Sequence, residues 1–167
     1  IFDVASSTKP ILQGTYTLGH TVNSLVVRGA YAYIATAASE ELKIFDISDP
    51  MSPQLVGGSG ILPDTPANGK SVYVVGSTAY LGRTVGLSPS AKQFYVFDTI
   101  DPATAPLPVM GSPVDVNDSI NSLLVRFGLA FFTTRNEFQV WSLSNVNALT
   151  KIGSLARARE HDSGARL

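Results

Sequence analysis

The polar side chains best placed for chemistry occur in three short segments, each of which leads into an apolar stretch. Imidazole, carboxylate, amide, hydroxyl and ammonium groups donate and accept hydrogen bonds, so this set suits the binding of a polar ligand. The same residues also suit ordinary solvated loops. The ligand-binding candidates are His20, Thr21, Asn23, Asp64, Asn68, Lys70, Asp118 and Asn121, with Thr65, Asp115 and Asn117 beside them.

Catalytic and metal-binding groups are scarce in the sequence. The chain has two histidines and no cysteine, so it offers no thiolate nucleophile, no thiolate metal site and no disulfide. His161 near the C-terminus is given no role. No Asp-x-Asp-x-Asp-Gly calcium loop occurs. We therefore predict no catalytic residue, no metal and no cofactor.

Five aspartates recur at matching positions before or within turns: Asp3, Asp46, Asp49, Asp98 and Asp101. Such a pattern is open to an acid-base or metal interpretation. However, an aspartate in a turn commonly accepts hydrogen bonds from its own backbone amides. We expect these residues to stabilise turns.

Two further motifs are weak. Gly57-Gly58-Ser59-Gly60 is rich in glycine but lacks the Lys-Ser/Thr of a phosphate-binding loop, so we interpret it as a flexible connection. Ser59 has no strand-to-helix setting and is not expected to be a nucleophile. Trp141 occupies the position that Phe45 and Phe97 hold elsewhere, which favours core packing over sugar stacking.

The elements that must position these segments are repeated strands. One strand ending occurs four times, as Ile1-Phe2-Asp3-Val4, Ile44-Phe45-Asp46-Ile47, Val96-Phe97-Asp98-Thr99 and Val140-Trp141-Ser142-Leu143. Intervals of about 40 to 50 residues between strand-like copies are typical of β-propeller blades.

Each of the last three endings is preceded by two more strand-like stretches with a glycine between them. These glycines, Gly29, Gly76 and Gly128, fit the positive φ that a tight hairpin requires. A proline-containing turn and a short apolar segment follow the ending, and they suit an outer strand. Each full repeat is thus predicted to have four short antiparallel strands.

The predicted fold class is all-β, with about 3.5 propeller blades in residues 1–156. Residues 1–18 supply a partial blade, and residues 19–60, 61–113 and 114–156 supply whole ones. Leu155 to Arg159 is open to a turn of helix, and residues 157–167 are expected to be a mobile or non-native tail. Because a closed ring needs about four blades or more, the propeller is expected to be part of something larger or to be completed by a dimer.

The best copy, residues 25–58, resembles the LVIVD repeat. It reads Leu-Val-Val-x-Gly-x-Tyr-Ala-Tyr-Ile-Ala, then Leu-Lys-Ile-Phe-Asp-Ile-Ser-Asp-Pro-x-x-Pro-x-Leu-Val-Gly. The resemblance extends to about Ala156. It implies a bacterial or archaeal β-propeller, of a family frequent in secreted or surface proteins and mostly without an assigned activity. The second copy differs from this pattern by a longer segment between its second and third strands. The third copy differs by lacking the Asp-Pro turn.

The composition of the chain limits the classes of partner that it is expected to bind. Twelve basic and thirteen acidic residues give a net charge of −1, which argues against nucleic acid as a partner. No stretch of about eighteen apolar residues is present, so we expect no membrane span. The start at Ile1 fits a mature or trimmed fragment. The composition without cysteine and poor in lysine leans towards an extracellular, cell-surface or periplasmic location.

Two functions follow from these observations. The first is a non-catalytic propeller module for protein or glycan binding, or for scaffolding, at the cell surface. The alternative is a fragment of a propeller hydrolase or lyase whose catalytic groups lie partly outside this chain. A homodimer and the remainder of a longer parent chain are both open as the partner that completes the propeller.

Overall fold

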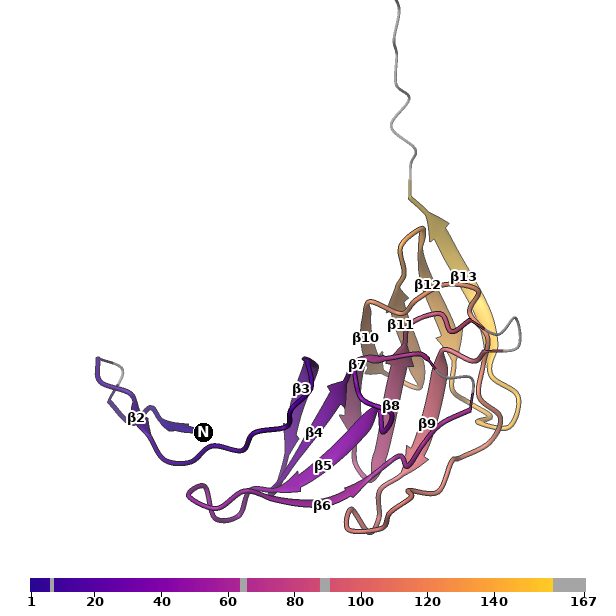
Figure 1. Cartoon of the computed structure of the whole chain (residues 1–167). Helices are drawn as coiled ribbons and strands as arrows, with labels where there is room; N and C mark the ends of the chain where they lie inside the picture. The colour runs from indigo at the N-terminus through magenta and orange to yellow at the C-terminus, as the bar shows by residue number, and fades with distance from the viewer. Residues whose placement is uncertain (7, 64–65, 88–90, 158–167) are drawn as a thin grey trace, which may run out of the picture.

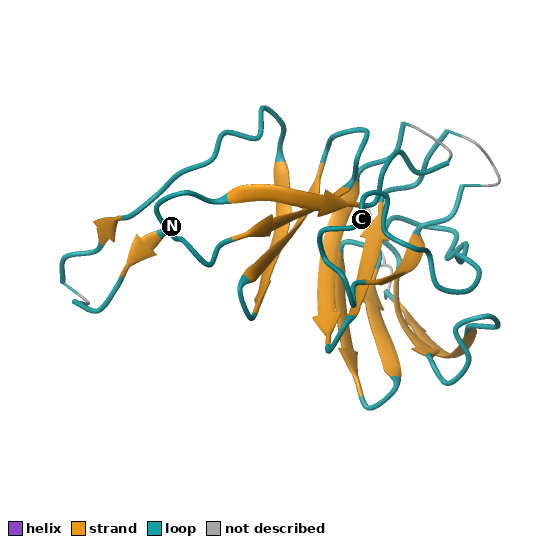
Figure 2. Cartoon of the chain, turned by 90° about the horizontal axis from the view of Figure 1, so that it is seen from below, coloured by secondary structure: helices purple, strands orange, loops and turns teal. Residues whose placement is uncertain are grey.

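Four antiparallel sheets make up the chain in the computed structural model, which describes residues 1–6, 8–63, 66–87 and 91–157 (Figure 1). No helix occurs among these residues, and so none that could cross a membrane (Figure 2). The strands are β1 (Phe2–Asp3), β2 (Ile11–Leu12), β3 (Val22–Arg28), β4 (Tyr31–Thr36), β5 (Leu42–Asp46), β6 (Gln54–Gly58), β7 (Gly69–Val75), β8 (Thr78–Arg83), β9 (Phe94–Asp98), β10 (Ser122–Arg126), β11 (Leu129–Thr133), β12 (Glu137–Ser142) and β13 (Thr150–Ala156).

Each sheet follows the chain order, as expected of a propeller blade. The complete blades are β3-β4-β5-β6 and β10-β11-β12-β13, the middle blade is β7-β8-β9, and the first sheet is the pair β1-β2. The first strands lie next to one another, because β7 contacts β3 on one side and β10 on the other. The all-β fold class and the arrangement in blades are confirmed.

The hairpins between first and second strands use the predicted glycines. Gly29, Gly76 and Gly128 have φ values of 59°, 57° and 70°, which lie in the left-handed region that glycine adopts at low cost. Phe127, which precedes Gly128, also has a positive φ of 53°. These turns fix the register of each hairpin, such as Leu25 opposite Ile34.

The core lies between successive blades. One cluster joins Leu42 and Ile44 of β5 to Val72 and Val74 of β7 and Phe97 of β9. A second joins β8 and β9 to the last blade and includes Phe94, Leu123, Phe132 and Trp141. Trp141 is buried and its indole N–H donates to Gln139 at 2.8 Å. Its predicted role in packing is confirmed.

Glycines in or just after the outermost segment of a blade allow blades to approach closely. A Cβ on Gly57 of β6 would lie 2.1 Å from the carbonyl oxygen of Pro102, which belongs to the turn of the following blade. The same contact occurs between Gly14 and Pro50, and between Gly111 and Val146. We call this arrangement the glycine-turn contact.

The prediction that Gly57-Gly58-Ser59-Gly60 is a flexible connection is wrong. Gly57 and Gly58 are buried residues of β6, and the backbone N–H of Ser59 donates to the carbonyl of Leu42 at 3.0 Å. These positions require glycine because neighbouring backbone atoms occupy the space of a side chain: a Cβ on Gly58 would clash with the carbonyl oxygen of Leu42.

The middle blade departs from the four-strand prediction. Its fourth strand is reduced to two isolated bridges to β9, between Phe97 and Val109 and between Phe94 and Val114. Hydrogen bonds from Asp98 to Pro108 and from Met110 to Val96 flank the first bridge. Pro106 and Pro108 have no backbone N–H, so a continuous ladder cannot form there.

The helical alternative at the C-terminal end is also wrong. β13 extends to Ala156, with Leu155 opposite Phe138, and the Arg157 N–H donates to the Asn136 carbonyl at 2.7 Å. The neighbouring strand offers backbone partners to residues 155–157, and that outweighs their helix propensity. Ala158 and Arg159, the rest of this segment, lie outside the described residues. Of the predicted tail, only Arg157 is among the described residues.

Candidate functional site

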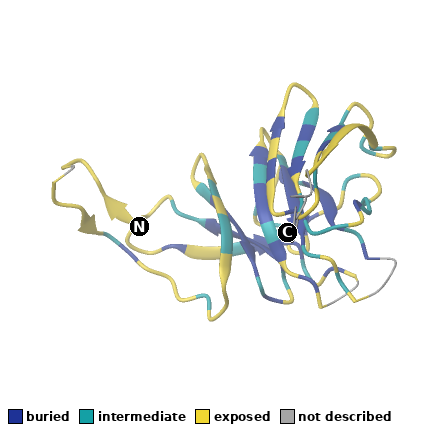
Figure 3. Ribbon diagram, turned by 90° about the horizontal axis from the view of Figure 1, so that it is seen from above, coloured by how far each residue is buried: buried dark blue, intermediate teal, exposed yellow. Residues whose placement is uncertain are grey.

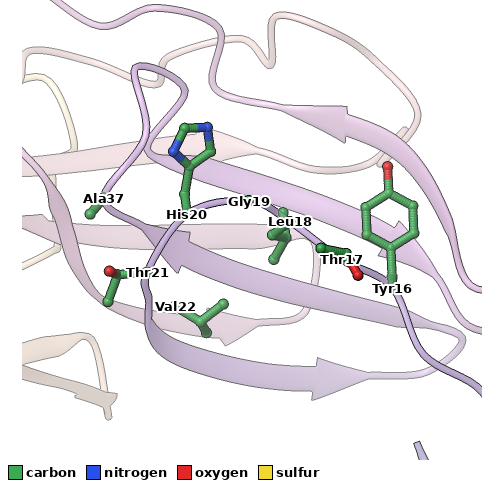
Figure 4. A pocket seen from close by; sticks show the side chains of 8 residues that line it. All are labelled: Tyr16, Thr17, Leu18, Gly19, His20, Thr21, Val22 and Ala37. Carbon is green, nitrogen blue, oxygen red and sulfur yellow. The ribbon is translucent and has the colours of Figure 1, made fainter.

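The segment between the first sheet and β3 forms one wall of an open hollow of about 760 Å³. Its lining residues are Tyr16, Thr17, Leu18, Gly19, His20, Thr21, Val22 and Ala37. Gly19 has a φ of 71°, and the Thr21 carbonyl accepts from the Ala37 N–H at 2.9 Å, which ties the segment to the end of β4. Figure 4 shows the exposed Tyr16 side chain at the start of the segment and the exposed His20 side chain further along it, next to Gly19.

A second hollow of about 380 Å³ adjoins the first, and the two share Ala37. It is lined by Ala37, Ala38, Ser39, Ile61, Pro66, Ala67 and Asn68. The backbone of Asn68 is held by two 2.9 Å hydrogen bonds with Thr84, which leave its side chain exposed. We call the lining of both hollows the rim surface. It brings together three of the predicted residues, His20, Thr21 and Asn68.

The loops that lead into the first strands lie at one end of the blades. Asn23 at the start of β3 donates its side-chain amide to the carbonyl of Gly69 at the start of β7, at 2.7 Å. The Ile120 N–H, just before β10, donates to the carbonyl of Arg83, which pairs across the sheet with Gly69. The three loops therefore face the same way.

Two predicted residues flank the rim surface instead of lining it. Asn23 is half-buried and its amide joins two blades through the bond to Gly69. Lys70 is half-buried at the start of β7. Asp64 and its neighbour Thr65 lie outside the described residues.

Asp118 and Asn121 belong to the last blade and do not line the rim surface. Asp118 lines a separate hollow of about 80 Å³ with Asn117, Glu137 and Gln139 among others. Its carboxylate accepts the backbone N–H of Ser119 at 2.7 Å, and the backbone N–H of Arg135 and side-chain amide of Asn136, both at 3.1 Å. Asn121 is exposed, and its N–H donates to Thr133.

The repeated aspartates have the predicted role in turns. The side chains of Asp3, Asp46 and Asp98 accept the backbone N–H two residues further on, at 2.8 to 2.9 Å, and Asp49 and Asp101 do the same at 2.9 and 3.1 Å. The hydrogen bond from the Ser48 N–H lowers the pKa of Asp46 below its ordinary value, because it stabilises the ionised carboxylate.

The sequence reasoning missed a buried ion pair between Glu41 and Arg83. Both side chains are completely buried, with Nε–Oε2 at 2.7 Å and a second guanidinium nitrogen 2.5 Å from Oε1. Arg83 also donates to the carbonyls of Lys92 and Pro63 and lies 5.0 Å from the Tyr95 ring centroid. The sequence contains a signal for this pair, because Arg83 stands at the repeat position that is threonine in the other copies, Thr36 and Thr134.

This pair is suited to holding two blades together. Glu41 precedes β5 of one blade and Arg83 ends β8 of the next. Both carboxylate oxygens accept hydrogen bonds from the guanidinium, and neither group is open to solvent. Among the described residues no group of three or more His, Cys, Asp or Glu side chains could hold a metal ion.

Comparisons with known proteins agree with this architecture. The family model described as the LVIVD repeat matches residues 19–58. A search of curated proteins gives no match. Among solved structures, the chain is similar to two computationally designed proteins, Ika8 (TM-score 0.57, 11% identity, 80% of this chain covered) and Ika4 (TM-score 0.54, 10% identity, 73% covered).

A natural structure is similar as well. It is the Bacteroides ovatus protein described as xyloglucan PUL GH43B, with a TM-score of 0.50, 18% identity and 77% of this chain covered. The chain spans 36% of the length of Ika8, 66% of Ika4 and 30% of the Bacteroides protein. At these identities the likeness concerns the fold alone, and these neighbours are propeller-like. The chain therefore carries the LVIVD repeat and is built from the blades of a β-propeller.

Proposed function

We propose that the chain is a non-catalytic β-propeller module that binds a protein or a glycan through the rim surface, or holds such partners at the cell surface. The observation that carries the proposal is the joining of two hollows at Ala37, which places His20, Thr21 and Asn68 on one continuous surface. Polar groups that converge in a concave surface fix the orientation of a ligand.

The apolar part of the rim surface supports the same function. Tyr16 and Ile61 are exposed beside the polar residues. A tyrosine offers both a ring for stacking and a hydroxyl for hydrogen bonds, a combination enriched at binding surfaces. A mixed lining of this kind suits a sugar ring or a protein loop.

The use of the carboxylates also favours binding over catalysis. General acid-base chemistry needs a carboxyl group that can reach a substrate. Here the repeated aspartates accept hydrogen bonds from their own turns, and Glu41 is paired with Arg83 inside the fold. Location at the cell surface belongs to the same proposal and rests on the cysteine-free, lysine-poor composition and on the LVIVD repeat.

A propeller hydrolase or lyase remains the second candidate. Its support is the likeness to the Bacteroides ovatus xyloglucan PUL GH43B, of which this chain spans 30%. Under this candidate, the acid, base or metal groups would lie partly outside this chain.

Titration calorimetry with xyloglucan oligosaccharides tests both candidates, with release of new reducing ends as the second readout. We expect binding without reducing-end release, and a loss of affinity of about tenfold in His20→Ala and Asn68→Ala, which corresponds to about 1.4 kcal/mol. Asp118→Ala, in the separate hollow, is the matched control and should bind as the parent does. Binding that survives both rim substitutions contradicts the proposed site. Reducing-end release supports the second candidate.

A further inference from the structure

Asn117 begins the one Asn-x-Ser/Thr tripeptide of the chain. The sequence has seven asparagines, and only in Asn117-Asp118-Ser119 does a serine or threonine follow two positions later. In secreted proteins this tripeptide is the acceptor of N-linked glycans when it lies in a surface loop. The same tripeptide also arises by chance, so its place in the fold decides whether it can serve as an acceptor.

The tripeptide lies between two buried anchors in the loop that leads into β10. Val116 and Ile120, on either side of it, are 3% and 0% exposed. The Val116 N–H donates to the side-chain oxygen of Gln93 at 2.9 Å, and the Ile120 N–H donates to the Arg83 carbonyl at 3.0 Å. Asn117 itself is exposed, as are most of the loops in Figure 3, where buried residues concentrate in the central strands. The loop is thus fixed at both ends and presents Asn117 to solvent.

The backbone at Asn117 forms a tight turn. Its φ is 62°, in the left-handed region that asparagine enters more readily than most residues. Its N–H donates to the Asp115 carboxylate at 2.8 Å. Gly19 holds the equivalent place in the first whole blade, four residues before the Asn-Ser that both copies share, and its φ is 71°. The turn needs a residue that tolerates a positive φ, and glycine meets this need as well as asparagine does.

The side-chain amide of Asn117 has no hydrogen-bond partner among the residues that the structure describes. Other asparagines are engaged. The Asn23 amide donates to the Gly69 carbonyl at 2.7 Å, and the Asn136 amide donates to the Asp118 carboxylate at 3.1 Å. The backbone conformation accounts for an asparagine or a glycine at position 117, but it makes no use of the amide. That group is therefore available for chemistry from outside the fold.

Ser119, the third residue of the tripeptide, keeps a usable hydroxyl. Its oxygen accepts the Val85 N–H at 3.0 Å, which ties the loop to the segment after β8. A hydroxyl that accepts one hydrogen bond still has its proton to donate. Since the tripeptide requires serine or threonine at this position, the hydroxyl is a group that the glycosylating enzyme recognises. Asn117 and Ser119 together offer both groups of an acceptor.

We propose that Asn117 is the acceptor of an N-linked glycan. The amide nitrogen Nδ2 forms a bond to C1 of a sugar that is carried as a lipid-linked diphosphate. The bond between C1 and the diphosphate oxygen breaks, the diphosphate leaves with the electron pair, and Nδ2 loses one of its two protons to the medium. A separate oligosaccharide transferase supplies the donor. This site rests on the cell-surface location in the proposed function and on none of the rim residues.

The experiment secretes the full chain from a host that adds N-linked glycans and measures the masses of its peptides. We expect a glycan on the peptide that contains Asn117. Asn117→Gly should lose the glycan without a lower melting temperature, because glycine adopts the positive φ at low cost. Ser119→Ala should lose the glycan and Ser119→Thr should keep it. Asn121→Gln is the matched control: Asn121 is an exposed asparagine of the same loop without the third-position hydroxyl, so this variant should keep the glycan of the parent.

Three results would overturn the proposal. One is a secreted, folded parent chain whose Asn117 carries no glycan. The second is a glycan that persists in Asn117→Gly or in Ser119→Ala. The third is a clear fall in the melting temperature of Asn117→Gly, which would show that the fold itself uses the amide. None of these measurements involves a ligand of the rim surface, so a failure of rim binding and a failure of this site are distinguished.

Discussion

Arg83 donates hydrogen bonds to both carboxylate oxygens of Glu41 across the junction of two blades, and both side chains are completely buried. The pair joins residues that are far apart in sequence, and the guanidinium also holds the carbonyls of Lys92 and Pro63. A buried charge that loses its partner is costly, because neither water nor another charge replaces it.

Arg83→Met should therefore lower the free energy of unfolding by about 3 to 5 kcal/mol, as measured by urea denaturation. Lys151→Gln is the control, since it removes the half-exposed ion pair with Glu137 and should cost about 0 to 1 kcal/mol. The double variant Glu41→Leu/Arg83→Met should recover much of the loss, because no buried charge is left unpaired. Equal losses in Arg83→Met and Lys151→Gln would contradict the role of the pair.

The glycine-turn contact gives a second prediction. Gly57→Ala should destabilise the chain, because its new Cβ would lie 2.1 Å from the rigid backbone oxygen of Pro102. Gly153 holds the equivalent place on β13, opposite Val140 as Gly57 is opposite Ile44, but nothing lies within 4 Å of its Cβ position. Gly153→Ala should change stability by no more than about 0.5 kcal/mol, or increase it. Thermal unfolding of the two variants side by side provides the measurement.

Phe97 and Phe45 hold the same place in two blades but have different neighbours. Phe97 is fully buried and stacks on Tyr95 with ring centroids 6.0 Å apart. Phe97→Ala should cost about 3 to 5 kcal/mol, the usual range for a buried aromatic ring. Phe45→Ala should cost less, because Phe45 borders an apolar hollow of about 130 Å³ and has Tyr16 on that side. If both variants lose the same free energy of unfolding in denaturant titrations, then the surroundings of Phe45 are packed as well as those of Phe97, and the prediction is wrong.

Tyr80 makes stability depend on alkaline pH. Burial raises the pKa of Tyr80 above its ordinary value of 10.0, because the phenolate is poorly solvated in the fold. The contribution of the neutral hydroxyl is fully present below about pH 10, and it is lost as the pH rises through the raised pKa. Tyr80→Phe keeps the ring beside Phe94, so its stability should fall less steeply above pH 10 than that of the parent. Unfolding midpoints that fall in parallel for both proteins would contradict this.

The repeat made most of the strands predictable from sequence. Hairpin glycines such as Gly29, turn aspartates such as Asp46 and the shared slot of Phe97 and Trp141 each act within a few residues or at a fixed interval. The Glu41–Arg83 pair could not be derived in the same way, because it depends on how two blades stack. The outer strand β6 was expected, but its last residues, Gly57 and Gly58, were wrongly assigned to a flexible connection. The reason is related: a glycine that makes room for a neighbouring backbone has the same sequence signature as one in a flexible linker.

The candidate site was predictable only in part. The three polar loops do lie at one end of the blades, as the order of strands implied. However, His20, Thr21 and Asn68 line adjoining hollows, while Asn23 is used to join β3 to β7 and Asp118 belongs to the last blade. Loop composition does not reveal which amide will be used by a neighbouring strand, since that depends on distances between blades.

The glycine-turn contact also bears on how such chains can evolve. It joins a glycine to a backbone carbonyl, and the oxygen comes from Pro50, Pro102 and Val146 in turn, so the contact does not depend on the side chain of the residue that supplies it. A duplicated or exchanged blade can therefore form the glycine-turn contact with its new neighbour, even after its other residues have diverged. Ring size and blade order can thus change by gene duplication and recombination without a new interface having to arise at each outer edge.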